Sequence, residues 1–354
     1  MFSFRTTPLE DQLDKALLDG NVGCFCTQNC WDTGKGRYMT DIFRERGNLR
    51  AVFSPVDSEL SPDTGHISAD TALLEDLNAV VVEIQDTGAR HFGYTLDVFR
   101  LMQQLAAMEN PPALYIVDHI NPTGRAVEGT IPGPDADTSV PKVAHRHGLT
   151  LGELANLHYA EIGARFPMHV ISYLATGSNR HIMPWTIAPA PDIPGFFTCE
   201  MLAGGMLWLQ TSITPGIGTP RPYEYFGAPF IIHDGGSVPP GTAQATMRPC
   251  TFTPAYGNYA GERCRGYQII LEPGAEYHSL MHTLQLMRHF RDRYSAFELK
   301  SGFRELLADD ILLDYIEGRI EWYAAKDHIK VEEQKWIRKA KKFLLYDSQP
   351  YRIK

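Results

Sequence analysis

The chain has 354 residues, a charged fraction of 21% and a formal net charge of −9 at pH 7. A chain of this length buries a large core and typically forms two domains. The negative balance excludes a general nucleic-acid binder or a protein of anionic membrane surfaces. No apolar stretch reaches the roughly 18–20 residues that span a bilayer. The start, Met1–Pro8, lacks the basic and long apolar regions of a signal peptide, so we expect a cytoplasmic protein, or a periplasmic one if a leader was removed.

Cysteine spacing does not indicate a metal centre. Cys24 and Cys26 alternate in an apolar run, which is not CxxC spacing, and the other four cysteines are scattered. We therefore expect buried, reduced thiols, with no metal site and no cofactor.

Short apolar runs alternate with helical patterns through the first half of the chain. This alternation predicts an α/β fold with a doubly wound, mostly parallel sheet. Strands are expected at 22–27, 51–54, 79–84, 113–117 and 168–174, and helices at 8–19, 42–50, 73–77, after 90 and at 151–162.

The second half has a different character. Three loops rich in proline or glycine mark the change, at Pro189–Pro194, Thr211–Pro222 and Asp234–Gly241, and the last is the best linker candidate. Aromatic-rich strands and then helices follow it. We therefore predict a Rossmann-like domain over 1–233 that carries most of the active site, and a smaller α+β domain over 242–354 that closes a cleft. A GxGxxG motif is absent after the first strand and a Walker lysine is absent throughout, which excludes a typical nucleotide site.

Polar side chains collect where two neighbouring predicted strands end. Gln85 and Asp86 follow one strand, Asp118 and Asn121 follow the next, and Glu128 lies just beyond. In parallel sheets the carboxyl ends of the strands meet at one edge, where ligands bind. Glycoside hydrolysis needs two carboxyl groups, one to protonate the leaving oxygen and one to activate water or attack the sugar. This stretch is therefore a candidate active-site rim.

Each carboxylate also has a structural interpretation. Asp86 and Asp118 either cap the helices that follow or take part in chemistry. Glu83 lies inside a strand and is expected to have a structural role, such as pairing with Arg90. Glu128 has no local structural role that the sequence reveals, which favours function.

Further along the chain the interpretation is similarly divided. Glu153 forms a capping box with Thr150. His147 either contacts a ligand or closes the turn before that helix. Arg221 and Glu224 either form an ion pair or clamp a carboxylate or sugar hydroxyls on a proline-stiffened loop.

Several segments together carry a recognisable pattern that extends over nearly the whole chain. They are Val82–Arg90, Val117–Gly124, Val127–Gly129, Arg146–Leu154, Pro189–Pro194, Gly218–Glu224, Gly227–Pro229, Phe252–Pro254 and Tyr259–Gly261. This pattern resembles one bacterial family, the DUF1343 proteins described as NamZ-type exo-β-N-acetylmuramidases. The resemblance implies a Rossmann-like domain, a smaller C-terminal domain and hydrolysis of terminal N-acetylmuramic acid from peptidoglycan fragments.

The resemblance also guides the expected site. Glu128 is expected to be the principal catalytic carboxylate, with Asp86 or Glu224 as the second. The sugar and its lactyl carboxylate are expected to contact Arg90, Tyr94, Asp118, Asn121, His147, Asp192 and Arg221. The expected partner is a muramic acid-containing glycan or muropeptide.

The chain departs from the family pattern at three places. Ser54–Ser58, including Val56, stands where the family usually has Gly-Pro-Glu-His-Gly, and Leu209 and Pro215 stand where it has glutamates. These changes motivate a rival hypothesis, a protein that binds peptidoglycan fragments without cleaving them. A third hypothesis is a hydrolase for another acidic sugar or glycopeptide.

Overall fold

The computed structural model describes residues 19–32, 35–55, 58, 71–133, 141–172, 187–233, 239–272 and 276–346. Its first part is built on a five-stranded parallel sheet with the order β4-β1-β5-β6-β7. These strands are β1 (Val22–Cys26), β4 (Leu49–Phe53), β5 (Ala79–Glu83), β6 (Ala113–Val117) and β7 (Met168–Ile171). The predicted α/β fold with a doubly wound sheet is confirmed, whereas the helix expected at 8–19 lies almost wholly outside the described residues.

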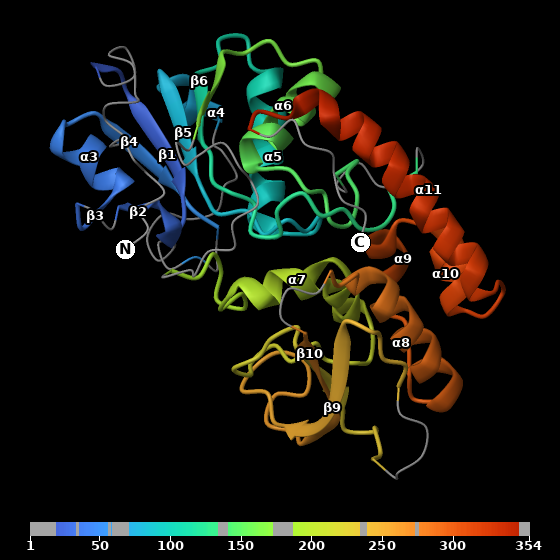
Figure 1. Ribbon diagram of the computed structural model, residues 1–354. Coiled ribbons are helices and arrows are strands. Elements are labelled where there is room, and N and C mark those ends of the chain that lie inside the picture. Colours follow the sequence, from blue (N-terminus) through green and yellow to red (C-terminus); the bar gives the residue numbers. More distant parts are fainter. Residues whose placement is uncertain are drawn as a thin grey trace.

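Helices cover both faces of this sheet because its strands are apolar on both sides (Figure 1). In β5, Val80 and Val82 join the larger apolar cluster, while Val81 joins a second cluster on the opposite face. The larger cluster includes side chains of α5 (Gly93–Ala107) and α6 (Leu151–Glu161), and the second includes those of α3 (Met39–Glu45). The remaining short elements of this part are η1 (Gln28–Cys30), β2 (Trp31–Asp32), β3 (Arg37–Tyr38) and α4 (Thr71–Glu75).

The later elements form a second unit around a three-stranded antiparallel sheet with the order β8-β10-β9. Its strands are β8 (Tyr225–Ala228), β9 (Ala245–Phe252) and β10 (Cys264–Leu271). Its helices are α7 (Phe196–Gly205), η2 (Met206–Gln210), α8 (Ser279–Arg293), α9 (Phe303–Leu307), α10 (Asp310–Ile316), α11 (Trp322–Ala340) and η3 (Lys341–Phe343).

The packing divides the chain near the start of α7. Helix α7 packs against α8, where the backbone N–H of Gly204 donates to Ser279 Oγ at 3.1 Å. Strand β8 pairs with β10, although it precedes residue 233, the predicted end of the first domain. Both α7 and β8 therefore belong in space with the later elements.

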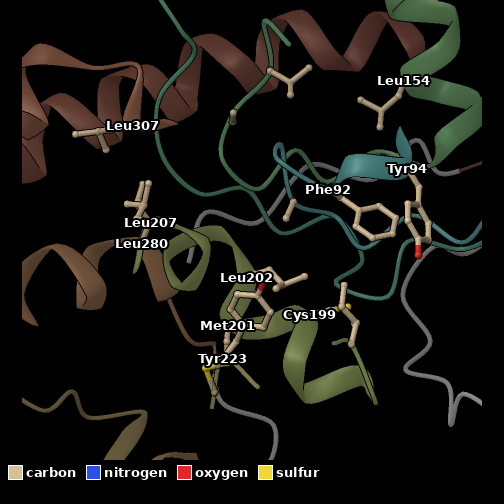
Figure 2. Close-up of a cluster of buried hydrophobic side chains, with 14 of the residues drawn as sticks. Phe92, Tyr94, Leu154, Cys199, Met201, Leu202, Leu207, Tyr223, Leu280 and Leu307 are labelled. Atoms are coloured by element: carbon tan, nitrogen blue, oxygen red, sulfur yellow. The ribbon is translucent and has the colours of Figure 1, made fainter. Parts of the chain in front are cut away.

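One apolar core runs through both units. Figure 2 shows Phe92, Tyr94 and Leu154 of the sheet domain with Cys199, Leu202, Leu280 and Leu307 of the second domain, all members of one buried cluster. None of the six cysteines forms a disulfide, and five of them are buried, which agrees with the expected reduced thiols. Among the described residues, no helix is both long and apolar enough to cross a membrane.

Helix α11 returns from the second domain to the first (Figure 1). The indole N–H of Trp336 donates to the backbone oxygen of His147 at 2.8 Å, and the hydroxyl of Tyr346 donates to Asp118 at 2.7 Å. The sheet domain is therefore completed by residues from the far end of the described chain.

Candidate functional site at the strand ends

The loops that follow β5 and β6 are held together by side-chain amides. Gln85 Nε2 donates to the backbone oxygen of Ile120 at 3.0 Å, and Asn121 Nδ2 donates to that of Leu149 at 2.8 Å. The polar residues at these strand ends therefore lie at one edge, as the strand order predicts.

Asp86 is buried and bound on both carboxylate oxygens. Oδ1 accepts the hydroxyl of Thr95 at 2.5 Å, and Oδ2 accepts the backbone N–H of Gly88 at 2.7 Å. His147 Nε2 lies 3.3 Å from Oδ2, while His147 Nδ1 accepts the backbone N–H of Leu149 at 3.2 Å. Burial opposes ionisation, but the charge of His147 and these hydrogen bonds outweigh it and lower the pKa of Asp86.

Asp118 caps α6, the helix that follows the next strand-end loop. Its carboxylate accepts the backbone N–H of Gly152 at 2.8 Å and the hydroxyls of Thr150 and Tyr346, each at 2.7 Å. Burial nevertheless raises the pKa of Asp118 to about 6. Of the two interpretations left open by the sequence, the structure shows that this carboxylate caps a helix.

Glu128 joins the two domains. Its Oε1 lies 2.7 Å from Arg146 Nε, and its Oε2 accepts the hydroxyl of Ser279 at 2.9 Å and the backbone N–H of Leu280 at 3.0 Å. His278 Nδ1 lies 3.4 Å from the same oxygen. The carboxylate thus binds the N-terminus of α8, where the helix dipole favours negative charge. This is a structural role that the local sequence did not reveal.

Arg90 also connects the domains. Its guanidinium donates to the backbone oxygens of Thr130 at 2.9 Å and Leu307 at 3.0 Å, the latter at the end of α9. Burial lowers the pKa of Arg90 to about 9. The expected pairing of Glu83 with Arg90 is wrong, because Glu83 Oε1 instead lies 3.1 Å from His119 Nε2.

A second group lies at the rim of the C-terminal domain. Tyr256 donates its hydroxyl to Asp192 Oδ1 at 2.6 Å, and this hydrogen bond raises the pKa of Tyr256 to about 12. Arg221 Nη1 lies 3.2 Å from Glu224 Oε2, and the arginine side chain is 54% exposed. Burial raises the pKa of Glu224, although Arg221 acts in the opposite direction.

The expected site residues therefore separate into two sets. The interior set is at most 3% exposed and consists of Asp86, Arg90, Tyr94, Asp118, Asn121, Glu128 and His147. The rim set consists of Arg221, which is exposed, Asp192, which is half-buried, and Glu224, which is buried beside Arg221. Val56 lies outside the described residues. At the other two departures from the family pattern, the backbone oxygens of Leu209 and Pro215 accept hydrogen bonds from Lys300 Nζ and the Tyr223 N–H.

One loop connects the rim to the strand ends. Gln28 and Asn29, just after β1, donate side-chain amide hydrogens to the backbone oxygens of Ala188 and Ile187 at 2.9 Å and 3.1 Å. Asp192 follows only four residues after Ala188, a distance that the chain spans in at most about 14 Å. The Asp192–Tyr256 pair therefore lies within about 14 Å of a loop residue that contacts the end of β1.

The sequence singled out Glu128 but not the charged interior cluster to which it belongs. Arg146 binds Glu128 and also Glu200, whose Oε2 lies 3.2 Å from Arg146 Nη1. His278 bridges Glu128 and Glu333, with 2.8 Å between His278 Nε2 and Glu333 Oε1. The residues of this cluster come from segments far apart in sequence, so no local motif could have predicted it. In the part of the chain that is described, no three histidine, cysteine or acidic residues are arranged to hold a metal ion.

Comparison with known proteins extends over both domains. The family model for the N-terminal domain of exo-β-N-acetylmuramidase NamZ matches residues 65–196, and the model for its C-terminal domain matches residues 203–346. The peptidoglycan β-N-acetylmuramidase NamZ of Bacillus subtilis (strain 168) is 26% identical over 298 residues, which cover 77% of this chain and 69% of that protein.

Solved structures agree at the level of the fold. Two DUF1343 family proteins from Bacteroides fragilis NCTC 9343 superpose with a TM-score of 0.78 at 21% identity, over 96% of this chain and 98% and 97% of theirs. The two domain models match in order and together span most of the sequence. The chain therefore belongs to the NamZ (DUF1343) family.

Proposed function

We propose that this protein is a glycoside hydrolase that releases terminal N-acetylmuramic acid, or a related acidic amino sugar, from peptidoglycan fragments. The observation that carries the proposal is the match of both domains to a peptidoglycan muramidase family. The polar residues at the strand ends and the rim supply the hydrogen-bonding groups that a sugar needs.

The rim supports an acidic sugar in particular. Arg221 is the exposed cation of this group, and a guanidinium binds a carboxylate in a planar, bidentate geometry. We assign it to the lactyl carboxylate of muramic acid. Asp192, Tyr256 and Glu224 then offer acceptors and a hydroxyl to the sugar ring.

The three carboxylates expected to be catalytic differ in their surroundings. Glu224 is buried beside the exposed Arg221, and burial raises its pKa, which is a setting in which a carboxyl group can serve in acid–base chemistry. Asp86 and Glu128 are fully enclosed by protein donors. A catalytic role for Glu128 stays a prediction, and it requires Arg146 and α8 to move away from the carboxylate.

Turnover of chromogenic β-N-acetylmuramides tests the proposal. A panel of aryl glycosides should show hydrolysis of the muramide in preference to the β-N-acetylglucosaminide, with release of free N-acetylmuramic acid. Glu128→Gln and Glu224→Gln, each confirmed to be folded by circular dichroism, test the two carboxylates separately. Full activity of Glu128→Gln would remove that residue from the mechanism.

Binding without cleavage is the second candidate function. The complete occupation of Asp86 and Glu128 by protein donors favours it. Calorimetric binding of N-acetylmuramic acid, together with no turnover of any glycoside over a day, would establish it in place of hydrolysis.

A further inference from the structure

Glu83 and His119 form a carboxylate–imidazole pair that links the sheet interior to the surface. Glu83 Oε1 lies 3.1 Å from His119 Nε2; the glutamate side chain is 0% exposed and the histidine side chain is 19% exposed. A buried carboxylate is costly unless a partner compensates its charge. The imidazole is that partner, and it is also the group of the pair that solvent reaches.

The pair lies at the position in the sheet where ligands usually bind. In the order β4-β1-β5-β6-β7, the chain leaves β1 toward one edge and β5 toward the other. Ligands of open α/β sheets bind beyond the carboxyl ends of the strands at this point of reversal. Glu83 is the last residue of β5, and it lies in register with Cys26, the last residue of β1.

His119 is held firmly and is the exception in a buried stretch. Between Leu114 and Thr123, His119 is partly exposed and all the remaining residues are buried. Its backbone N–H donates to Asp118 Oδ1 at 3.0 Å, and the oxygen of the next residue, Ile120, is held by Gln85. The ring is therefore presented at a fixed place rather than on a mobile loop.

We propose that His119, positioned by Glu83, is the general acid of the hydrolysis proposed above. This inference rests on that proposed function. A carboxylate beside an imidazole favours its protonated form, which is the form that can donate a proton. In catalytic histidine sites a carboxylate commonly orients the imidazole that carries the proton, and Glu83 has this position relative to His119.

The step balances without any cofactor. The His119 imidazolium gives a proton to the glycosidic oxygen as the bond between that oxygen and the anomeric carbon breaks, and its electron pair stays on the oxygen. The aglycone leaves as an alcohol. The oxygen of a water molecule adds to the anomeric carbon, and the proton that this water loses restores the imidazolium.

Two titratable residues next to the Glu83–His119 pair affect which measurement can identify the role of His119. Cys26 faces Glu83 from β1, and a hydrogen bond to Cys30 together with burial raises the pKa of its thiol, so it stays neutral. Asp118, next to His119, is directed toward the start of α6 and has a pKa of about 6. Because Asp118 titrates near neutrality, a pH profile alone would not identify His119.

Leaving-group dependence identifies a general acid directly. With His119→Ala, kcat/KM on a muramic acid-containing disaccharide should fall roughly 10²- to 10⁴-fold, the usual contribution of acid–base catalysis. The 2,4-dinitrophenyl glycoside needs no protonation of its leaving oxygen, so its hydrolysis should change by less than about tenfold. Glu83→Gln should show the same contrast with smaller losses, because it only positions the ring.

His169→Ala is the matched control. His169 is exposed on β7, where it stacks on Tyr115 of the adjacent strand, and it should leave both substrates unaffected. Equal losses on the two substrates in His119→Ala, or no loss on either, would overturn the assignment.

The pair can also be tested without turnover. In NMR spectra of the full chain, the titration of the His119 ring should move to lower pH in Glu83→Gln. If the wild-type protein cleaves none of the glycosides, the proposed function and the acid role both fail. A titration of His119 that Glu83→Gln does not change would overturn the electrostatic coupling whether or not the enzyme is active.

Discussion

The carboxylate of Glu128 accepts the backbone N–H of Leu280 at 3.0 Å, so a loop of the sheet domain caps the first turn of α8 in the other domain. The same side chain neutralises Arg146, which is fully buried. One residue thus fixes the contact between the domains and compensates a buried charge.

Glu128→Gln is expected to destabilise the protein by about 3–5 kcal/mol, because it leaves the buried guanidinium of Arg146 with Glu200 as its remaining counter-charge. Urea denaturation followed by circular dichroism measures this change. The double variant Glu128→Gln/Arg146→Met should recover part of the loss. If the double variant is as unstable as the sum of the two single changes, the ion pair does not carry the effect.

The raised pKa of Asp118 makes stability depend on pH. The folded state binds this proton up to a pH of about 6, whereas the ordinary pKa of an aspartate is 3.8. Stability should therefore fall as pH rises from about 4 to about 6, by up to about 3 kcal/mol. Denaturation of the wild type and Asp118→Asn across this range checks it, since the variant should lack this part of the slope.

Asp86 should show the opposite dependence. Its pKa is lower in the folded protein, mainly because the charge of His147 and its hydrogen bonds overcome the effect of burial. Its contribution is present above a pH of about 4 and is lost as pH falls through the lowered value. Acid unfolding of Asp86→Asn should accordingly show a weaker loss of stability below pH 4 than the wild type; an identical acid limb would contradict the prediction.

Trp336 should be the main attachment of α11 to the sheet domain. Trp336→Phe removes the hydrogen bond to His147 and should cost about 1 kcal/mol, whereas Trp336→Ala should cost about 3–5 kcal/mol. Hydrogen exchange in residues 322–346 should accelerate in the alanine variant. Lys335→Ala, which removes an ion pair with Glu332 on the same helix, is the control and should change little.

Arg221→Ala should weaken the binding of N-acetylmuramic acid on the order of tenfold, which corresponds to the loss of one charge-assisted hydrogen bond. It should leave stability almost unchanged because the Arg221–Glu224 pair is largely exposed on the arginine side. Calorimetry with N-acetylmuramic acid and N-acetylglucosamine separates the two effects. A similar loss for the sugar that lacks the lactyl group would show that Arg221 does not bind that carboxylate.

The alternation of short apolar runs with helical patterns was sufficient to predict the parallel sheet. The strands at Ala79–Glu83 and Ala113–Val117 were predictable because apolar runs of this length, bounded by polar residues, fit a buried strand. The capping box of Thr150 and Glu153 was predictable for the same reason, since both partners lie within one turn.

The partners of the strand-end residues were not predictable in this way. Glu128 binds Leu280, 152 residues away, and Trp336 binds His147, 189 residues away. Such contacts follow from the packing of whole domains, which a single sequence does not specify. The Glu83–His119 pair was predictable in principle, because each residue continues the alternating face of its strand beyond the apolar run and the two strands are adjacent.

The return of α11 to the sheet domain has a consequence for biosynthesis. During translation the five strands leave the ribosome long before Trp336 and Tyr346, which supply contacts to His147 and Asp118. The sheet domain is therefore synthesised before the second domain but completed after it. A nascent chain paused within the second domain would hold a sheet domain that lacks these two contacts.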